Sequence, residues 1–199
     1  MPKTYTIQAS EATAHTDTVD SYTFGCTYQP KTDFKLWYVK DEGFYLHMTC
    51  QESNPKAIYT KDMDPVYKDS CMEFFMSFYP ELPVTNYINF EMNSNGALLT
   101  VYHDIIDGIN HKTFIIDTFD GYVRPTVCDT WWGVELFIPE GFIKKAYQTD
   151  KPLGPRFTGN VYKCGDETAS RHFGSWNPIT LDEPDFHRPE FFGDFILAD

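Results

Sequence analysis

The amino-acid sequence predicts an all-β protein, a two-sheet antiparallel β-sandwich. Apolar and polar residues alternate with a period of two along most of the chain, which is typical of half-buried strands. Short segments rich in Gly, Pro and Asn separate these runs, and only residues 139–147 could form a helical turn or two. About ten strands without intervening helices imply two antiparallel sheets packed face to face.

The first strand pair is a hairpin over residues 34–39 and 43–51. Phe44, Leu46 and Met48 alternate with polar neighbours, so one face of the second strand is expected in the core. The turn Asp-Glu-Gly lies between the two strands, as a hairpin requires. Because neighbouring strand residues point to opposite faces, His47 and Met48 could not ligate one haem together.

The next hairpin, over residues 71–78 and 87–93, carries the most informative pattern. If the apolar faces of both strands coincide, each apolar residue of one strand lies opposite an apolar residue of the other, so the residue numbers of every opposed pair add up to the same even number. When that number is 164, Glu73 lies opposite Glu91. We therefore expect Glu73, Asn89 and Glu91 on one solvent-accessible face. Opposed carboxylates destabilise a sheet unless a cation, a lysine, a shared proton or a hydroxyl-rich ligand compensates them. A register shifted by two would leave both glutamates solvated.

The remaining strands follow the same alternation, and the loop between residues 177 and 190 is the longest one expected. The expected strands cover residues 97–103, 114–116, 122–128, 131–138, 158–163 and 192–197.

Length and composition limit the function. The chain has 199 residues, enough for a single domain over 1–199, and its formal charge of −13 disfavours nucleic acid and membrane surfaces as partners. No apolar run could span a bilayer, and the first residues lack a signal-peptide core. As written the chain is expected to be cytoplasmic, or extracellular if a leader has been removed. Five scattered cysteines without a CxxC pair argue against a zinc knuckle and a disulfide framework.

Aromatic residues make up 17% of the chain, more than packing of a core this size needs, so some rings are expected to face a ligand. The six histidines show no HExxH motif, and no Walker loop, GxGxxG or nucleophile motif occurs. In the last third of the chain, polar groups and rings are interleaved. Such a mixture suits a carbohydrate, whose hydroxyls need polar partners and whose C–H faces stack on rings.

Four segments resemble motifs of the carbohydrate-binding modules of family 9 and their stand-alone relatives, which have a jelly-roll or DOMON-like sandwich. Asp69-Ser-Cys-Met-Glu-Phe-Phe75 is similar to the family's D-S-V-E-I/F-F strand, and Trp132-Gly-Val-Glu-Leu-Phe-Ile-Pro139 to its W-x-x-E-x-x-I-P strand. Ser175-Trp-Asn-Pro178 and Phe186–Gly193 are similar to the closing motifs. The order and spacing of these segments match the family over nearly the whole chain from about Trp37 onward.

The resemblance implies a sugar clamped between two tryptophans and bound by a glutamate, an arginine and a glutamine. The glutamate matches Glu73, whereas the arginine falls near Glu91 and the glutamine near Lys163. The tryptophans fall at Val66 or Tyr67 and at Phe186, so both are replaced. Lys163 is expected to approach the carboxylate pair. The expected ligand-binding residues are Glu73, Asn89, Glu91, Lys163, Trp176, Phe186, Tyr67 and His187.

The sequence therefore predicts a non-catalytic carbohydrate-binding protein. Two alternatives stay open: a small glycoside hydrolase that uses Glu73 and Glu91, and a DOMON-like haem or redox-partner domain. The resemblance implies no catalytic residue and no cofactor, although it allows a structural calcium ion. It also allows a glycoside hydrolase as a protein partner besides the carbohydrate ligand.

Overall fold

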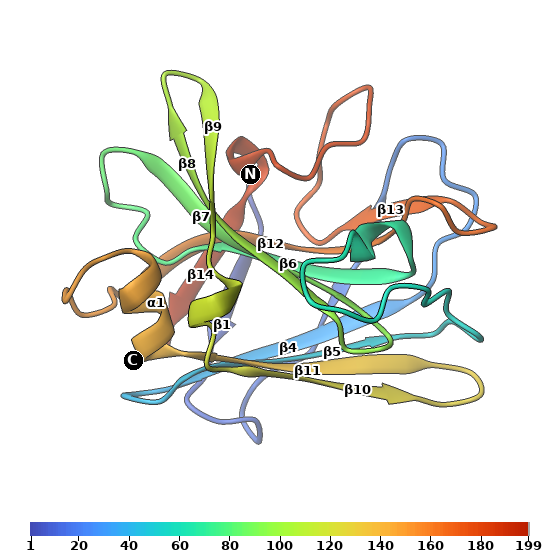
Figure 1. The fold of residues 1–199 in the computed structure, drawn as a ribbon, viewed down its shortest axis with the longest axis horizontal. Coiled ribbons are helices and arrows are strands. Elements are labelled where there is room, and N and C mark those ends of the chain that lie inside the picture. The colour runs from blue at the N-terminus through green and yellow to red at the C-terminus, as the bar shows by residue number, and fades with distance from the viewer. Residues whose placement is uncertain (199) are drawn as a thin grey trace.

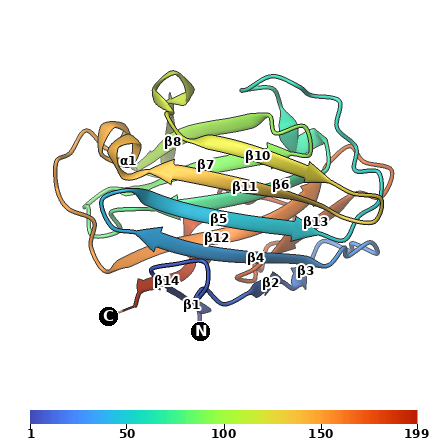
Figure 2. The ribbon, with the colours of Figure 1, turned by 90° about the horizontal axis from the view of Figure 1, so that it is seen from below.

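Two β-sheets pack face to face in the computed structural model, which describes residues 1–198 (Figures 1 and 2). The larger sheet has nine strands, in the order β1-β14-β12-β6-β7-β8-β9, with β13 paired to β12 and β3 paired to β13. The smaller sheet has five strands, in the order β10-β11-β5-β4-β2. The predicted all-β sandwich is confirmed.

The strands of the larger sheet are β1 (Thr4–Ile7), β3 (Ser21–Tyr22), β6 (Cys71–Ser77), β7 (Thr85–Asn93), β8 (Leu98–Ile106), β9 (Ile109–Phe114), β12 (Arg156–Gly165), β13 (His172–Ser175) and β14 (Gly193–Leu197). The smaller sheet comprises β2 (Asp17–Val19), β4 (Thr32–Val39), β5 (Gly43–Cys50), β10 (Tyr122–Val127) and β11 (Trp132–Pro139). The helical segments are η1 (Val66–Lys68), η2 (Ile116–Thr118), α1 (Glu140–Ala146) and η3 (Pro189–Phe191). Among the described residues, no helix has the length and apolar character needed to span a bilayer.

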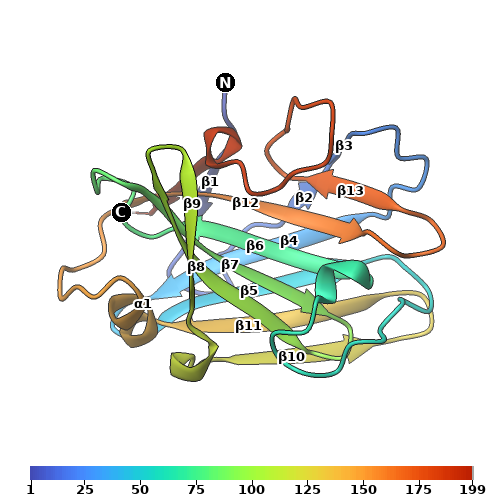
Figure 3. The same cartoon turned by 45° about the horizontal axis from the view of Figure 1, so that its top comes forward.

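The core lies between the sheets and is formed by the inward residues of the alternating strands. Phe44, Leu46 and Met48 of β5 belong to the same buried cluster as Phe74 of β6 and Phe90 of β7. The period of two therefore places the intervening residues of β6 and β7 on the outer face of the larger sheet. That face carries the site described below, and Figure 3 shows β6 and β7 side by side within the sheet.

Most of the strands expected from the alternation are present, including the hairpin of β4 and β5, which pairs Val39 with Gly43. The strand expected at 114–116 is wrong: β9 occupies Ile109–Phe114, and a 3-10 helix follows at Ile116–Thr118. Because β9 is an exposed edge strand, its sequence has no apolar alternation that could have marked it.

The larger sheet is mixed rather than wholly antiparallel, because β1 pairs in parallel with β14 through Tyr5 and Phe195. The alternation did not indicate β1, β2, β3 or β13, which have two to four residues each. Strands this short contain too few alternating residues to predict.

Candidate functional site

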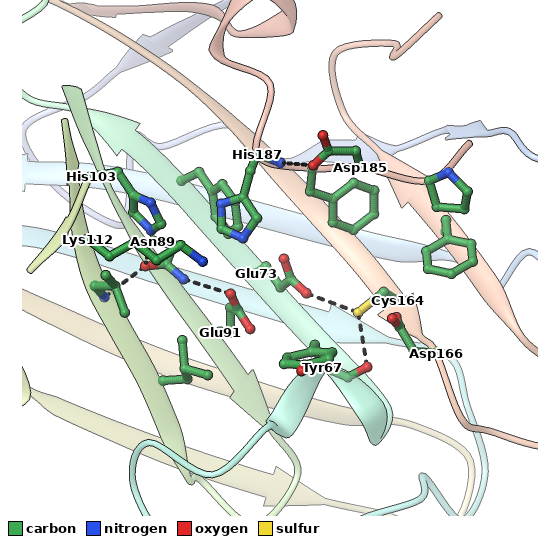
Figure 4. A pocket seen from close by; sticks show the side chains of 16 residues that line it. Tyr67, Glu73, Asn89, Glu91, His103, Lys112, Cys164, Asp166, Asp185 and His187 are labelled. Atoms are coloured by element: carbon green, nitrogen blue, oxygen red, sulfur yellow. Dashed lines mark hydrogen bonds between the residues drawn. The ribbon is translucent and has the colours of Figure 1, made fainter. Parts of the chain in front are cut away.

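A pocket of about 320 Å³ lies on the outer face of the larger sheet, over β6, β7, β8 and β12. The segment Pro184–His187 and the 3-10 helix η1 contribute to its walls (Figure 4). Pockets of about 300–1,000 Å³ are typical of small-molecule sites, so this one has room for a ligand of mono- or disaccharide size. The lining residues are Tyr67, Glu73, Phe75, Asn89, Glu91, Leu99, Val101, His103, Lys112, Cys164, Asp166, Phe173, Pro184, Asp185, Phe186 and His187.

Glu73 and Glu91 form the floor of the pocket, and they are directly opposed in the register of β6 and β7, as predicted. Asn89 shares their face, two residues from Glu91. The three side chains are nearly buried, with exposed fractions of 3%, 1% and 4% for Glu73, Asn89 and Glu91. They face the pocket rather than open solvent.

Asn89 fixes the orientation of Glu91. Its side-chain oxygen accepts a hydrogen bond from the backbone N–H of Val101 at 2.8 Å, which directs its amide nitrogen to Glu91 Oε1 at 2.7 Å. The other carboxylate oxygen, Glu91 Oε2, is buried and has no hydrogen-bond partner in the described part of the chain. Buried carboxylate oxygens are normally paired, so this oxygen of a pocket-lining residue is left for a ligand to satisfy.

Burial sets the protonation of this pair. It raises the pKa of Glu91 to about 7, and the pKa of Glu73 rises well above its ordinary value because of burial and of its proximity to Cys164 and Glu91. The Cys164 thiol donates a hydrogen bond to Glu73 Oε1 at 3.0 Å. Both carboxyl groups therefore favour the protonated form more strongly than exposed carboxyl groups do.

Two histidines form one wall, and both are neutral. His103 stacks on Tyr87 with ring centroids 4.5 Å apart, and His187 Nδ1 lies 2.9 Å from the Tyr87 hydroxyl. Burial lowers the pKa of His103 to about 3 and that of His187 to about 4. The cation of the pocket is Lys112, an exposed residue of β9 opposite His103.

Aromatic rings stand at the rim. Tyr67, on η1, keeps 37% of its surface exposed, whereas the preceding Val66 is fully buried. Of Val66 and Tyr67, the structure therefore places Tyr67 in the pocket. Phe186 lies in the loop after Pro184, stacked on Tyr162 with ring centroids 4.1 Å apart and planes 7° apart.

The structure places Lys163 elsewhere, and its expected approach to the carboxylate pair is wrong. Tyr162, not Lys163, is opposite Glu73, so Lys163 points to the inner face of the sheet. There its ammonium is fully buried, 3.5 Å from Glu52 Oε2 and 2.7 Å from His172 Nε2. Although burial opposes ionisation of Glu52, the Lys163 charge contributes to a lowered pKa of that carboxyl.

Trp176 does not line the pocket either. It is fully buried in the core between the sheets, where its ring lies 4.9 Å from that of Phe195. Its indole N–H donates to Asp17 Oδ2 at 2.8 Å. Trp176 is a core residue, so its expected contact with a ligand is wrong.

Of the eight expected residues, the structure brings six together in one pocket: Tyr67, Glu73, Asn89, Glu91, Phe186 and His187. Sequence reasoning missed the acids Asp166 and Asp185, the cation Lys112, and Cys164. Cys164 could have been predicted from the correct register of its strand. Because Tyr162 lies opposite Glu73, residue 164 lies on the same face of the sheet as Glu73. Lys112 and Asp185 carry no such signal, since one lies on a polar edge strand and the other in a loop.

One cluster of metal-binding type lies beside this floor. Ligand atoms of Cys71, Glu73 and Cys164 all lie within 4.8 Å of one another, and no other group of three His, Cys, Asp or Glu side chains within residues 1–198 does so. Two thiols and a carboxylate suit zinc rather than calcium, which takes oxygen ligands. The cluster therefore does not fit the calcium ion that the resemblance allowed.

A second pocket, of about 430 Å³, lies near α1. Its buried acid Glu140 is fully engaged: one oxygen accepts from the Tyr38 hydroxyl at 2.5 Å and the other pairs with Lys144 at 2.7 Å. With its carboxylate satisfied inside the chain, this pocket is a weaker candidate than the one over Glu73 and Glu91.

The comparisons with known proteins agree with the sequence motifs. In the search of solved structures, the chain is similar to a protein from Bacteroides uniformis ATCC 8492 proposed to bind carbohydrate, with 22% identity, a TM-score of 0.83 and 100% of both chains covered. It is also similar to a family 9 carbohydrate-binding module from Caldicellulosiruptor kristjanssonii in complex with glucose (12% identity, TM-score 0.67, 98% of this chain and 96% of that one). The complex of such a module from the same organism with cellotriose gives 14% identity and a TM-score of 0.64, over 98% and 93% of the chains.

At these identities the solved structures show the shared fold. No match appears in a search of curated proteins. The family itself is shown by the sequence model for carbohydrate-binding family 9, which matches residues 6–197. The chain belongs to carbohydrate-binding family 9.

Proposed function

We propose that this chain is a non-catalytic protein that binds a sugar in the pocket over Glu73 and Glu91. The observation that carries the proposal is the orientation of Glu91, whose buried Oε2 has no partner among the described residues and faces a pocket of sugar size. Membership of a carbohydrate-binding family supports it.

The chemistry of the pocket suits a sugar. Carboxylates accept hydrogen bonds from hydroxyls, and the two opposed acids offer several acceptors within a few ångströms of one another. Tyr67 and Phe186 provide ring surface at the rim, where the C–H face of a pyranose could stack. Both rings replace tryptophans of the family, so we expect weak binding, near millimolar, or about −4 kcal/mol.

Hydrolysis is less well supported by the same geometry. A retaining glycosidase needs one protonated carboxyl as acid and one ionised carboxylate as nucleophile. Here burial raises the pKa of both Glu73 and Glu91, and no lysine or arginine within residues 1–198 forms an ion pair that would hold one of them ionised as a nucleophile. We infer that the pair binds hydroxyls, and that any hydrolysis of the bound polymer is done by a separate glycoside hydrolase. A panel of chromogenic glycosides tests this inference, and turnover lost in Glu73→Gln would contradict it.

The binding test is isothermal titration calorimetry of the whole chain with glucose, xylose and cellotriose, together with a glycan array to find other ligands. Tyr67→Ala should abolish or strongly weaken the binding found. Trp131→Ala is the matched control, because Trp131 is also 37% exposed but lies outside the pocket lining. Equal binding by wild type and Tyr67→Ala, or a loss in the control alone, would contradict the proposed site.

A further inference from the structure

The paired acids of the pocket select a particular class of sugar. We propose that the ligand is an amino sugar, and that its ammonium group pairs with Glu91 and Glu73 at the pocket floor. This inference rests on the proposed function, since it names the sugar class for the same pocket. It excludes uronic acids and sulfated sugars, whose charge would oppose that of the floor.

The charge of the lining supports a cationic ligand. Four carboxyl groups line the pocket, those of Glu73, Glu91, Asp166 and Asp185, whereas Lys112 is the single lysine or arginine among the lining residues. Figure 4 shows Glu73 and Glu91 in the centre, with Asp166 and Asp185 on the sides towards β12 and the 184–187 loop. A pocket with low-dielectric walls in which acidic groups outnumber basic ones favours cationic ligands over anionic ones.

No lysine or arginine within residues 1–198 forms an ion pair with Glu73 or Glu91, and the charge of Lys112 offsets only part of the rise in the pKa of Glu91. Lys112 is exposed on the edge strand β9, and Lys163 is committed to Glu52 on the opposite face of the sheet. In the free protein, the raised pKa values of Glu73 and Glu91 favour neutralisation of the pair by protons. A bound ammonium group would replace a proton in that role.

The unpartnered oxygen of Glu91 points to a hydrogen-bond donor. Asn89 occupies Oε1, so Oε2 is left for a ligand. An ammonium group brings three donors and a positive charge, and charge-assisted hydrogen bonds are about twice as strong as neutral ones. A neutral hydroxyl satisfies the same oxygen without compensating the second carboxyl group.

The rim favours an amino sugar over a bare metal ion. Tyr67 and Phe186 offer ring surface that a sugar can use and a metal ion cannot. A soft metal ion at Cys71, Glu73 and Cys164 would instead make ligand binding sensitive to EDTA.

Binding of an ammonium group should release protons near neutral pH, because it favours the ionised form of Glu91, whose pKa in the free protein is raised to about 7. A neutral sugar should release fewer. The charged and titratable groups that face Glu91 from the surrounding elements are Tyr67 of η1, Glu73 of β6, His103 of β8, Lys112 of β9, Cys164 and Asp166 at the end of β12, and Asp185 and His187 of the loop.

The test compares three trimers of equal length by calorimetry at pH 7 in the presence of EDTA: a glucosamine trimer, an N-acetylglucosamine trimer and cellotriose. The glucosamine trimer should bind about tenfold more tightly than cellotriose, because its ammonium group forms a charge-assisted hydrogen bond where a hydroxyl of cellotriose forms a neutral one. Glu91→Gln should remove this preference, and Glu81→Gln, an exposed residue outside the pocket, should keep it. Titration of wild type in two buffers of different ionisation enthalpy measures the proton release and needs no variant.

Equal or tighter binding of cellotriose would overturn the amino-sugar inference and leave the proposed function intact. Binding of no sugar by the wild type, on these trimers or on an array, would overturn the proposed function and this inference with it. If the glucosamine trimer binds without EDTA but not with EDTA, its binding requires a metal ion. That result would overturn the inference that the ammonium group pairs directly with the carboxylates. Tighter binding of the glucosamine trimer with proton release, in EDTA, would support it.

Discussion

Glu73 of β6 and Glu91 of β7 lie directly opposite each other, and both side chains enter the same pocket (Figure 4). Opposed carboxylates on a sheet repel each other when ionised, and burial adds a desolvation cost. Burial raises the pKa of both groups, so protonation relieves this repulsion. Protonation of the pair therefore links the stability of the fold to pH and to ligand binding.

The pair should make the protein less stable as pH rises, the reverse of an ordinary ion-paired acid. Burial raises the pKa of Glu91 from 4.5 to about 7, so between these values the folded state holds a proton that the unfolded state has released. Stability therefore falls across this window and stays low above it, by as much as about 3 kcal/mol from Glu91. Glu91→Gln should remove the loss, so the variant should be more stable than wild type at pH 8 and similar to it at pH 4.5.

Urea unfolding from pH 4.5 to 8 measures this difference. The neutral histidines His103 and His187 act in the opposite sense, because their lowered pKa values cost stability as pH falls below 6.5. Subtracting the wild-type curve from that of Glu91→Gln removes their contribution. Glu81→Gln, an exposed residue, should show no such pH-dependent difference. A Glu91→Gln curve parallel to that of wild type would contradict the raised pKa.

Phe186 should contribute more to binding than to stability. Its ring is half-buried and stacked on Tyr162, so Phe186→Ala should cost about 1–2 kcal/mol, less than the 3–5 kcal/mol of a fully buried Phe. Binding of the sugar should be lost, whereas Phe186→Trp should tighten it by enlarging the stacking surface. Chemical denaturation and calorimetry on both variants check this. A stability loss of 3–5 kcal/mol with unchanged affinity would show that Phe186 is a packing residue.

The part of the site that the sequence could predict is the part fixed by local pattern. Glu73 and Glu91 belong to adjacent strands of one hairpin, and the coincidence of two apolar faces restricts their register to even shifts. Tyr67 and Phe186 were located by similarity to motifs beside them. Each of these predictions needed only short-range information or a family pattern.

The errors have a different origin, which is pairing between distant segments. Lys163 and Met72 are opposed although about ninety residues separate β12 from β6, and nothing local fixes that register. A shift of one residue exchanges the two faces of a strand, so the residue expected in the pocket lies in the interior instead. The pocket acids Asp166 and Asp185 follow a strand and lie in a loop, where no periodicity indicates direction.

Lys163 should be essential to stability and unimportant for binding. With Lys163→Met, Glu52 stays buried and loses its cation, which should cost about 3–5 kcal/mol, as measured by denaturant unfolding. Adding Glu52→Gln should recover most of this loss, because the second substitution removes the uncompensated charge. Sugar affinity should be unchanged in the double variant. A double variant as unstable as Lys163→Met, or one that folds but no longer binds, would contradict the role of Lys163 as the partner of Glu52.

Trp176 provides the remaining test, since sequence reasoning placed it at the ligand and the structure places it in the core. Trp176→Phe removes the indole N–H that donates to Asp17 and leaves unfilled volume beside Phe195, so it should cost about 1–3 kcal/mol of unfolding free energy. Because the ring lies between the sheets and the pocket lies on the outer face, sugar affinity should not change. Trp131→Phe, on a partly exposed residue outside the core, is the control and should alter neither quantity. Unchanged stability together with weakened binding would place Trp176 at the ligand after all, and would require the loop after β13 to open in solution.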